Sequence, residues 1–123
     1  MPITNKLSPL SINLASRLGF KQPKLAEEAI AKFCQRWKIE EFYLFGSVLR
    51  EDFSEKSDID VMLKFSPDAR LGFKFVTLCE ELETLFKRNV DVITKKGIEK
   101  TDNWIVQENI LNSTKLIYAQ KQR

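Results

Sequence analysis

Residues 44–65 read LFGSVLREDFSEKSDIDVMLKF, and this stretch decides the fold of the chain. The aromatic and apolar run from Phe42 to Phe45 stops at Gly46, which predicts a short buried strand. A polar and charged segment follows, and residues 58–65 then alternate between polar and apolar side chains. This alternation predicts a second strand with one apolar face and one face that carries acidic residues.

Helix-like spacing surrounds these two strands. Apolar residues recur every four positions after Pro23, and a broad apolar face returns between the second strand and a third one. The predicted helices cover residues 23–38, 72–87 and 101–111, with Thr101 or Asp102 as N-cap, and the further extended segments cover 90–93 and 115–119. We therefore expect an α/β (α+β) fold, in which helices flank a small mixed β-sheet.

The length of 123 residues fits one compact domain. We assign residues 23–123 to this domain and residues 1–22 to an N-terminal extension whose order the sequence does not predict. The net charge of +3 arises from 20 basic and 17 acidic side chains, a balance that does not favour direct nucleic-acid binding. No apolar run approaches the roughly 18 residues of a membrane span.

The chain contains no histidine. This excludes Ser-His-Asp hydrolysis, Cys-His proteolysis and histidine-based ribonuclease chemistry, so any catalysis must use carboxylates, lysine, arginine, hydroxyls or metal ions. A Cys/His zinc site is excluded as well, and we interpret Cys34 and Cys79 as structural thiols in buried positions. Free thiols lead us to expect a cytoplasmic location.

Three aspartates are the candidate metal ligands. Asp58 and Asp60 are two residues apart on the predicted strand, so both carboxylates project from one face. Such adjacent charges need a compensating cation, and hard oxygen ligands suit magnesium or manganese. Asp91 lies between two valines and should also point away from the core. If the two strands are neighbours, the three carboxylates meet and can hold two metal ions about 4 Å apart.

Gly46 and Ser47 are the candidate phosphate ligands. A strand that ends in Gly-Ser and turns into a short helix presents free backbone N–H groups, a usual basis of phosphate recognition. Arg50 follows Ser47 by three residues and would lie on the same side of a helical turn, within reach of a terminal phosphate oxygen. An exposed ion pair is an equally weighted interpretation of Arg50.

These residues resemble the signature of the DNA polymerase β-type nucleotidyltransferase superfamily, which consists of Gly-Ser, ten intervening residues and Asp-x-Asp. The ten residues here are 48–57. The stretch 44–65, the third aspartate within NVDVIT and the C-terminal ILNSTKLIYA together resemble minimal nucleotidyltransferase domains. The resemblance covers about residues 24–119 and implies a polymerase β palm-like fold.

The resemblance also implies roles for these residues. Asp58 and Asp60 are expected to bind two magnesium ions, and Asp91 to complete one site and help deprotonate the acceptor. Gly46 and Ser47 are expected to bind the β and γ phosphates of ATP. Such domains are often encoded beside a HEPN-type ribonuclease toxin, and they act as its antitoxin by transferring AMP from ATP to a toxin tyrosine. Whether the protein forms a homo- or a hetero-oligomer stays open.

Two features depart from the family pattern. Leu49 and Glu51 flank Arg50, where a small residue and a glycine are common, and Val106-Gln107-Glu108-Asn109 precedes Ile110 without the usual arginine. Neither change affects a predicted metal ligand. The details of phosphate contact and of partner docking are the features that these departures leave open.

Other functions and assignments also stay open. The same fold could neutralise a toxin by forming a complex with it, without catalysis. Transfer to a small molecule such as an aminoglycoside is less favoured, because those enzymes generally use a further domain to hold the acceptor. Trp104, near a predicted helix start, could be a core residue or an anchor that faces a partner.

Overall fold

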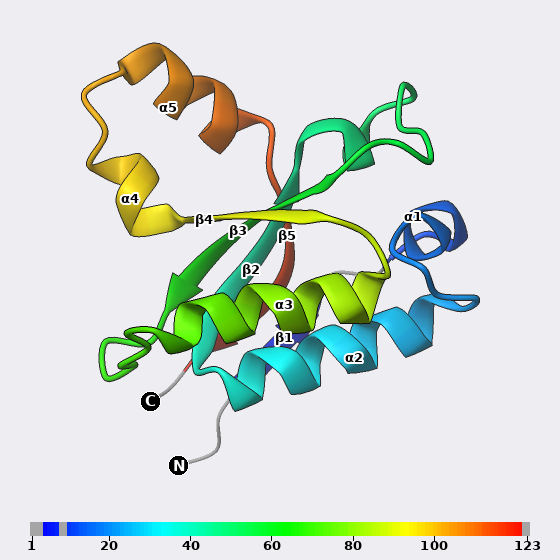
Figure 1. Cartoon of the computed structure of the whole chain (residues 1–123), viewed down its shortest axis with the longest axis horizontal. Coiled ribbons are helices and arrows are strands. Elements are labelled where there is room, and N and C mark those ends of the chain that lie inside the picture. Colours follow the sequence, from blue (N-terminus) through cyan, green and yellow to red (C-terminus); the bar gives the residue numbers. More distant parts are fainter. Residues whose placement is uncertain (1–3, 8–9, 122–123) are drawn as a thin grey trace.

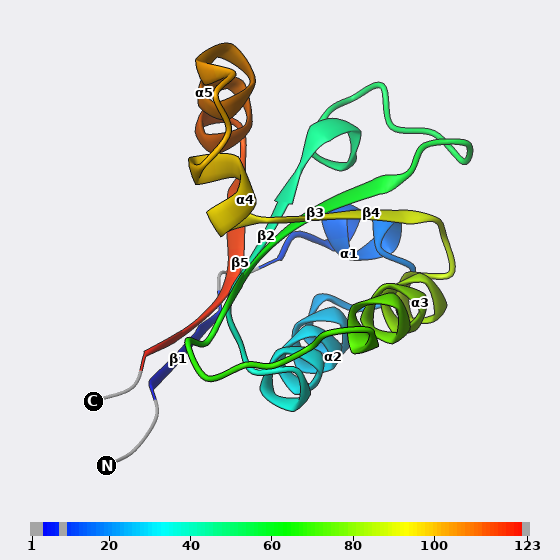
Figure 2. The same ribbon diagram turned by 60° about the vertical axis from the view of Figure 1, so that its left-hand side comes forward.

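The computed structural model describes residues 4–7 and 10–121. Its elements in chain order are β1 (Thr4–Leu7), α1 (Ile12–Arg17), α2 (Pro23–Arg36), β2 (Ile39–Phe45), the 3₁₀ turn η1 (Gly46–Leu49), β3 (Ile59–Phe65), α3 (Lys74–Phe86), β4 (Val90–Thr94), α4 (Lys95–Glu99), α5 (Trp104–Asn112) and β5 (Lys115–Lys121). In Figures 1 and 2, α2 and α3 lie side by side against the sheet, whereas α4 and α5 stand apart from them.

The five strands form one mixed sheet in the order β1-β5-β2-β3-β4. The pair β3 and β4 is parallel, and the other pairs are antiparallel. Parallel neighbours need a crossover connection, which α3 supplies here. The expected α/β fold with a small mixed sheet flanked by helices is therefore confirmed.

The core lies between the sheet and the helices α2 and α3. Pro23 occupies the first turn of α2, where its missing N–H costs no hydrogen bond. The rings of Phe42 and Phe86 pack edge to face with centroids 6.4 Å apart, and Phe33 packs in the same way on Phe42. Each such buried side chain contributes about 1.5–3 kcal/mol by leaving water. These contacts fix β2 and α3 to each other.

Residues 10–18 belong to the same core, although the sequence predicted no structure for them. The hydroxyl of Ser11 accepts a hydrogen bond from the backbone N–H of Leu14 at 3.0 Å and so caps α1. Leu14, Ala15 and Leu18 are buried among the residues of the main core. A six-residue helix shows too little periodicity to be recognised in a sequence, because its stability comes from tertiary contacts. We propose that the folded domain includes this segment.

The C-terminal region differs from the prediction in detail. The N-cap of α5 is Asn103, whose side chain accepts from the N–H of Val106, so both Thr101 and Asp102 were wrong as N-caps. The helix α4 was not expected, since no residue of it is buried. Trp104 is 66% exposed, which excludes the core assignment. The last extended segment is confirmed as β5.

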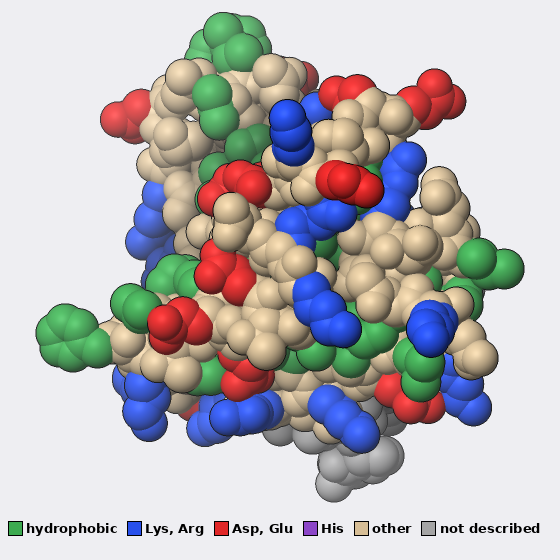
Figure 3. All heavy atoms as spheres, turned by 45° about the vertical axis from the view of Figure 1, so that its right-hand side comes forward, with side chains coloured by type: hydrophobic (Ala, Val, Ile, Leu, Met, Phe, Trp, Pro, Cys, Tyr) green, Lys and Arg blue, Asp and Glu red, His purple; other side chains and the backbone are tan. Residues whose placement is uncertain are grey.

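The two cysteines lie in apolar surroundings, as the sequence predicted. Cys34 is buried and Cys79 half-buried, and both are free thiols. Burial raises the pKa of the Cys34 thiol far above its ordinary value. On the face drawn in Figure 3, acidic and basic side chains are interspersed. Within the described residues, no helix is both long and apolar enough to span a membrane.

Candidate active site

The turn after β2 requires a glycine. Gly46 has φ +76°, and a Cβ atom added to it would lie 2.2 Å from Oδ2 of Asp60. Any side chain at this position would strain the backbone and displace the carboxylate. Val48, two residues further along η1, is fully buried and fixes the turn to the core. The backbone of the turn and the Asp60 carboxylate therefore lie in direct contact.

Strand register brings two of the three aspartates together. Asp60 on β3 lies directly opposite Asp91 on the parallel neighbour β4, and directly opposite Phe45 on β2. Residues opposite one another in neighbouring strands point to the same face of a sheet. The turn at Gly46 and the carboxylates of Asp60 and Asp91 thus meet at one corner, where β2 ends and β3 and β4 begin.

Asp58 lies close enough to Asp60 to influence it through its charge. Asp58 is exposed and precedes β3 by one residue. The pKa of Asp60 is raised, first by burial and then by the negative charges of Asp91 and Asp58, while the positive charge of Arg50 opposes the change. Three acidic groups thus interact at this corner, an arrangement that a bound cation would relieve.

The donor set fits a divalent cation in its chemistry. Carboxylate oxygens are the ligands that magnesium and manganese prefer. In the part of the chain that the structure describes, no three acidic, histidine or cysteine side chains are gathered into a ready-made metal cluster. Asp60 and Asp91 are aligned by their strands, whereas Asp58 lies before β3. The three carboxylates would therefore have to rotate toward a shared ion.

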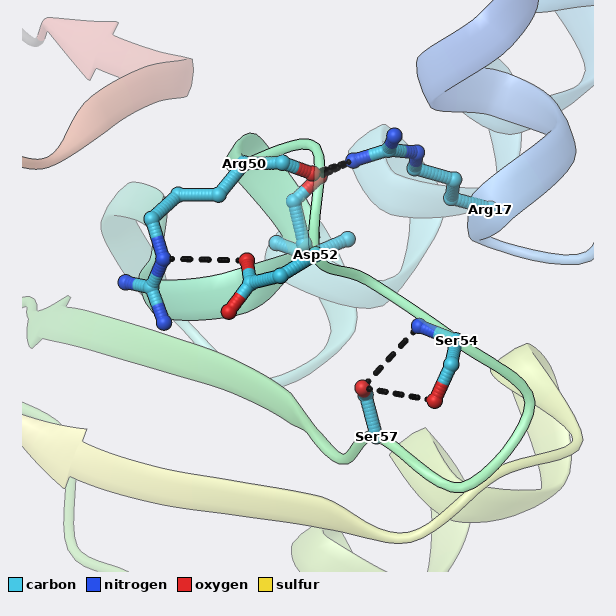
Figure 4. A network of polar contacts seen from close by, with 6 residues as sticks. Arg17, Arg50, Asp52, Ser54 and Ser57 are labelled. Carbon is cyan, nitrogen blue, oxygen red and sulfur yellow. Dashed lines mark hydrogen bonds and ion pairs between the residues drawn. The ribbon is translucent and has the colours of Figure 1, made fainter.

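Ser47 and Arg50 lie on the same turn but in different settings. Ser47 is half-buried within η1, and its carbonyl accepts from the N–H of Arg50 at 2.9 Å. The Arg50 side chain is 61% exposed, and its Nε donates to Asp52 at 3.2 Å (Figure 4). The structure thus shows Arg50 in the surface ion pair that was one of its two interpretations, within electrostatic reach of Asp60.

A polar cluster on the same sheet face was not anticipated. Nζ of Lys95 donates to Oε1 of Glu41 and to the hydroxyl of Tyr43, both at 3.1 Å, and that hydroxyl donates to Glu41 at 2.5 Å. Tyr43 lies opposite Met62, which is fully buried although it belongs to the face that carries the aspartates. Lys95 begins α4 directly after β4, and its spacing of two residues from Ile93 and four from Asp91 was the sequence signal for this cluster.

This cluster should stabilise the fold over a wide pH range. Burial alone would raise the pKa of Glu41, but hydrogen bonds from Tyr43 and Lys95 lower it overall. The pKa of Lys95 is raised, first by its hydrogen bond with Tyr43, against the effect of burial, and then by Glu41. A lowered carboxyl pKa contributes stability above its unfolded value, and a raised lysine pKa contributes below its unfolded value.

Lys95→Met is therefore expected to lower the free energy of unfolding by about 1 kcal/mol at pH 7. Urea unfolding of both proteins should give a constant difference between the ordinary pKa values of 4.5 for Glu41 and 10.5 for Lys95. The difference should shrink outside that window, and Lys95→Arg should recover part of it. An equal difference at pH 3 and pH 7 would show that the pairing with the Glu41 carboxylate contributes nothing.

Comparison with known proteins identifies the family of this chain. The sequence profile of the family described as "Nucleotidyltransferase domain" matches residues 26–117. Among relatives, MJ1379 of Methanocaldococcus jannaschii, provisionally named a protein adenylyltransferase, is 39% identical over 64 residues, which are 51% of this chain and 64% of that protein. Protein adenylyltransferase MntA of Thermococcus cleftensis is 37% identical over 71 residues, which are 54% and 71% of the two chains.

A further relative is matched over nearly the whole of its own length. MJ0604 of Methanocaldococcus jannaschii, also provisionally named a protein adenylyltransferase, is 30% identical over 101 residues, which cover 75% of this chain and 97% of that protein. The match with MJ1379, in contrast, spans less than two thirds of that protein. The range matched by the family profile, residues 26–117, spans the positions of the turn and of the aspartates described above.

Solved structures show the same fold. A provisionally named minimal nucleotidyltransferase superposes with a TM-score of 0.59 and 26% identity over 75% of this chain and 89% of that one. The complex of the tri-AMPylated Shewanella oneidensis HEPN toxin with its MNT antitoxin gives a TM-score of 0.51 and 22% identity over 76% and 69%. The sequence profile, the matched relatives and the fold agree, and this chain belongs to the nucleotidyltransferase domain family.

Proposed function

We propose that this protein transfers AMP from ATP to a hydroxyl group of a partner protein, a HEPN-type ribonuclease toxin, and thereby acts as its antitoxin. The observation that carries this proposal is the alignment of Asp60 with Asp91 on parallel neighbouring strands, next to a turn that has room only for glycine at position 46. Three interacting carboxylates beside a Gly-Ser turn suit a metal-bound triphosphate.

In this proposal each residue has a distinct role. Asp58, Asp60 and Asp91 would hold two Mg²⁺ ions, or Mn²⁺ in their place, which neutralise charge on the phosphates and on the leaving group. The turn at Gly46 and Ser47 would bind the β and γ phosphates through backbone N–H groups and the serine hydroxyl. Arg50 could turn from Asp52 to a phosphate oxygen, because its side chain is exposed.

The proposed reaction needs only ATP and the acceptor hydroxyl as reactants. The acceptor oxygen attacks the α phosphorus of ATP, a new P–O bond forms, and the bond between the α phosphorus and the bridging oxygen breaks. Pyrophosphate leaves, and the acceptor proton passes to the carboxylate of Asp91 or through it to water. Catalysis consists of positioning and charge neutralisation, as in other phosphoryl-transfer sites.

A protein acceptor suits the position of the site. Asp58 and Asp91 are exposed, so a large partner can approach the carboxylates directly. The relatives named protein adenylyltransferase and the fold of the MNT antitoxin bound to an AMPylated HEPN toxin support this choice of acceptor.

The test is incubation of the purified protein with ATP labelled at the α phosphate, magnesium and the product of the neighbouring gene, which this proposal expects to be the toxin. Label is expected on a hydroxyl side chain of the toxin, and none is expected with Asp58→Asn/Asp60→Asn. The matched control is Asp102→Asn, which makes the same chemical change at an exposed position before α5. Absence of label with the wild-type protein would reject the proposed transfer.

A parallel assay in cells separates catalysis from simple binding. Co-expression of the toxin with Asp58→Asn/Asp60→Asn should fail to restore growth if AMP transfer neutralises the toxin. Restored growth with this variant would instead identify complex formation as the antitoxin mechanism, the alternative that the sequence left open.

A further inference from the structure

The connection between η1 and β3 is fastened at both ends by arginines that come from elsewhere in the chain. Nη1 of Arg17, on α1, donates to the carbonyl of Val48 at 2.9 Å and also to the carbonyl of Arg50. Figure 4 shows the side chain of Arg17 extending from α1 to the carbonyl of Arg50. Val48 follows Ser47 directly and Arg50 comes two residues later, so Arg17 holds the end of the turn that carries Gly46 and Ser47.

Arg88, between α3 and β4, fastens the other half of the connection. Its Nη1 donates to the carbonyls of Ser54 and Ser57, both at 2.7 Å. The two serines are also joined to each other, because the N–H of Ser54 donates to the hydroxyl of Ser57 at 3.0 Å (Figure 4). Asp58, one of the proposed metal ligands, comes next in the chain, so its position depends on this half of the connection.

Phe53 links the two arginines. The guanidinium carbon of Arg17 lies 5.2 Å from the centroid of the Phe53 ring, and that of Arg88 lies 4.5 Å from it. The ring is half-buried and packs against the core. Cation–π contacts at such distances stabilise the pairing of an arginine with a ring. One aromatic side chain thus connects α1, the loop and the start of β4.

The helix that provides Arg17 lies before the matched family region, which begins at residue 26. Its buried residues anchor it to the core, and this gives the arginine a fixed base. We propose that the N-terminal segment is part of the active site of this chain, with Arg17 as a positioning residue that holds the Gly46–Ser47 turn in the conformation that binds ATP. This inference rests on the proposed function.

Arg17 can hold the turn because its guanidinium binds carbonyls at the C-terminal end of the 3₁₀ helix η1. Carbonyls at the end of such a helix have no partner within it, and a cation there satisfies them and opposes their partial negative charge. Without the guanidinium, the carbonyls of Val48 and Arg50 would need water, and the turn would sample other conformations. Binding of a triphosphate would then have to order the turn as well, which weakens affinity.

The experiment uses the full-length chain with Arg17→Met, Arg17→Lys and, as matched control, Arg36→Met. Arg36 also lies over an aromatic ring, that of Trp37 at 5.9 Å, and pairs with Glu81, but it belongs to α2 and does not contact the loop. Two readouts are needed: hydrogen exchange of the amides in residues 46–58, and calorimetric affinity for Mg·ATP. Urea unfolding of each variant shows whether the fold is retained.

Arg17→Met is expected to speed exchange in residues 46–58 and to weaken Mg·ATP binding, each by about tenfold. Arg17→Lys should lie between it and the wild type, because an ammonium group can reach a carbonyl but does not reproduce the planar stacking on Phe53. Arg36→Met should change neither quantity.

Two results would overturn the inference: unchanged exchange in residues 46–58 of Arg17→Met, or faster exchange together with unchanged ATP affinity. If the wild-type protein itself does not bind Mg·ATP, the proposed function fails, and the assigned role of Arg17 in ATP binding fails with it. In that case the exchange data still show whether Arg17 holds the turn, so the two failures are distinguishable.

Discussion

Asp60→Asn is expected to reduce AMP transfer by at least about 1,000-fold. Asp60 lies directly opposite Asp91 in the sheet, and its carboxylate touches the turn at Gly46, so it lies next to both parts of the site. An amide keeps the shape of the side chain but removes the charge that a divalent ion requires. The measurement is the initial rate of label transfer from ATP to the toxin at saturating magnesium.

The same variant should not lose stability. Negative charges on Asp58, Asp60 and Asp91 repel one another in the folded protein, so removal of one is expected to leave the free energy of unfolding equal or higher. Loss of transfer with retained stability would therefore place the effect in the chemistry. Activity within tenfold of the wild type would show that Asp60 is not a metal ligand in the reaction.

Gly46→Ala is expected to reduce transfer by about 100-fold and ATP affinity by more than tenfold. The new Cβ would lie 2.2 Å from Oδ2 of Asp60 and 3.1 Å from its Cγ, so either the carboxylate or the turn must move. The positive φ adds a backbone cost of about 1–2 kcal/mol for alanine. Calorimetry with Mg·ATP measures the loss of ATP affinity, and urea unfolding measures the backbone cost.

Gly72→Ala is the matched control for this substitution. Gly72 also has a positive φ, +52°, but a Cβ there would have no atom within 4 Å. Gly72→Ala should lower the free energy of unfolding by an amount similar to that of Gly46→Ala and leave AMP transfer unchanged. If the two variants lose the same activity, the contact between position 46 and Asp60 has no part in the function.

The sequence predicted those parts of the fold that show strong periodicity. The helix that begins at Pro23 and the alternating strand Ile59–Phe65 were both expected, because each buries one regular face. Gly46, directly after β2, predicted the turn correctly, because glycine adopts a positive φ at low cost. These features are local and can be read from neighbouring residues.

Other parts of the fold depend on contacts between distant residues. The helix α1 is six residues long and α4 has no buried residue, so neither shows a distinct pattern. Strand β5 lies between β1 and β2 in the sheet, although it is the last element of the chain. Spatial order of this kind follows from packing of the whole domain, and no short stretch of sequence contains it.

The site shows the same division. The resemblance to the family signature connected Gly46 with Asp60, and the apolar neighbours of Asp91 predicted its face. The sequence did not reveal that Arg17 and Arg88 hold the loop, because each lies 31 or more positions along the chain from the carbonyls it contacts. Side-chain bonds to a distant backbone have no sequence motif, and only the folded structure brings them together.

The most direct measurement is a crystal structure with Mn²⁺ and an ATP analogue whose α–β bridge is a methylene group, which the proposed reaction cannot cleave. We predict anomalous peaks for manganese about 2.2 Å from the carboxylate oxygens of Asp60 and Asp91, with the β and γ phosphates at the N–H groups of Gly46 and Ser47. Manganese and nucleotide bound at another surface, with Asp60 and Asp91 free of metal, would contradict the account.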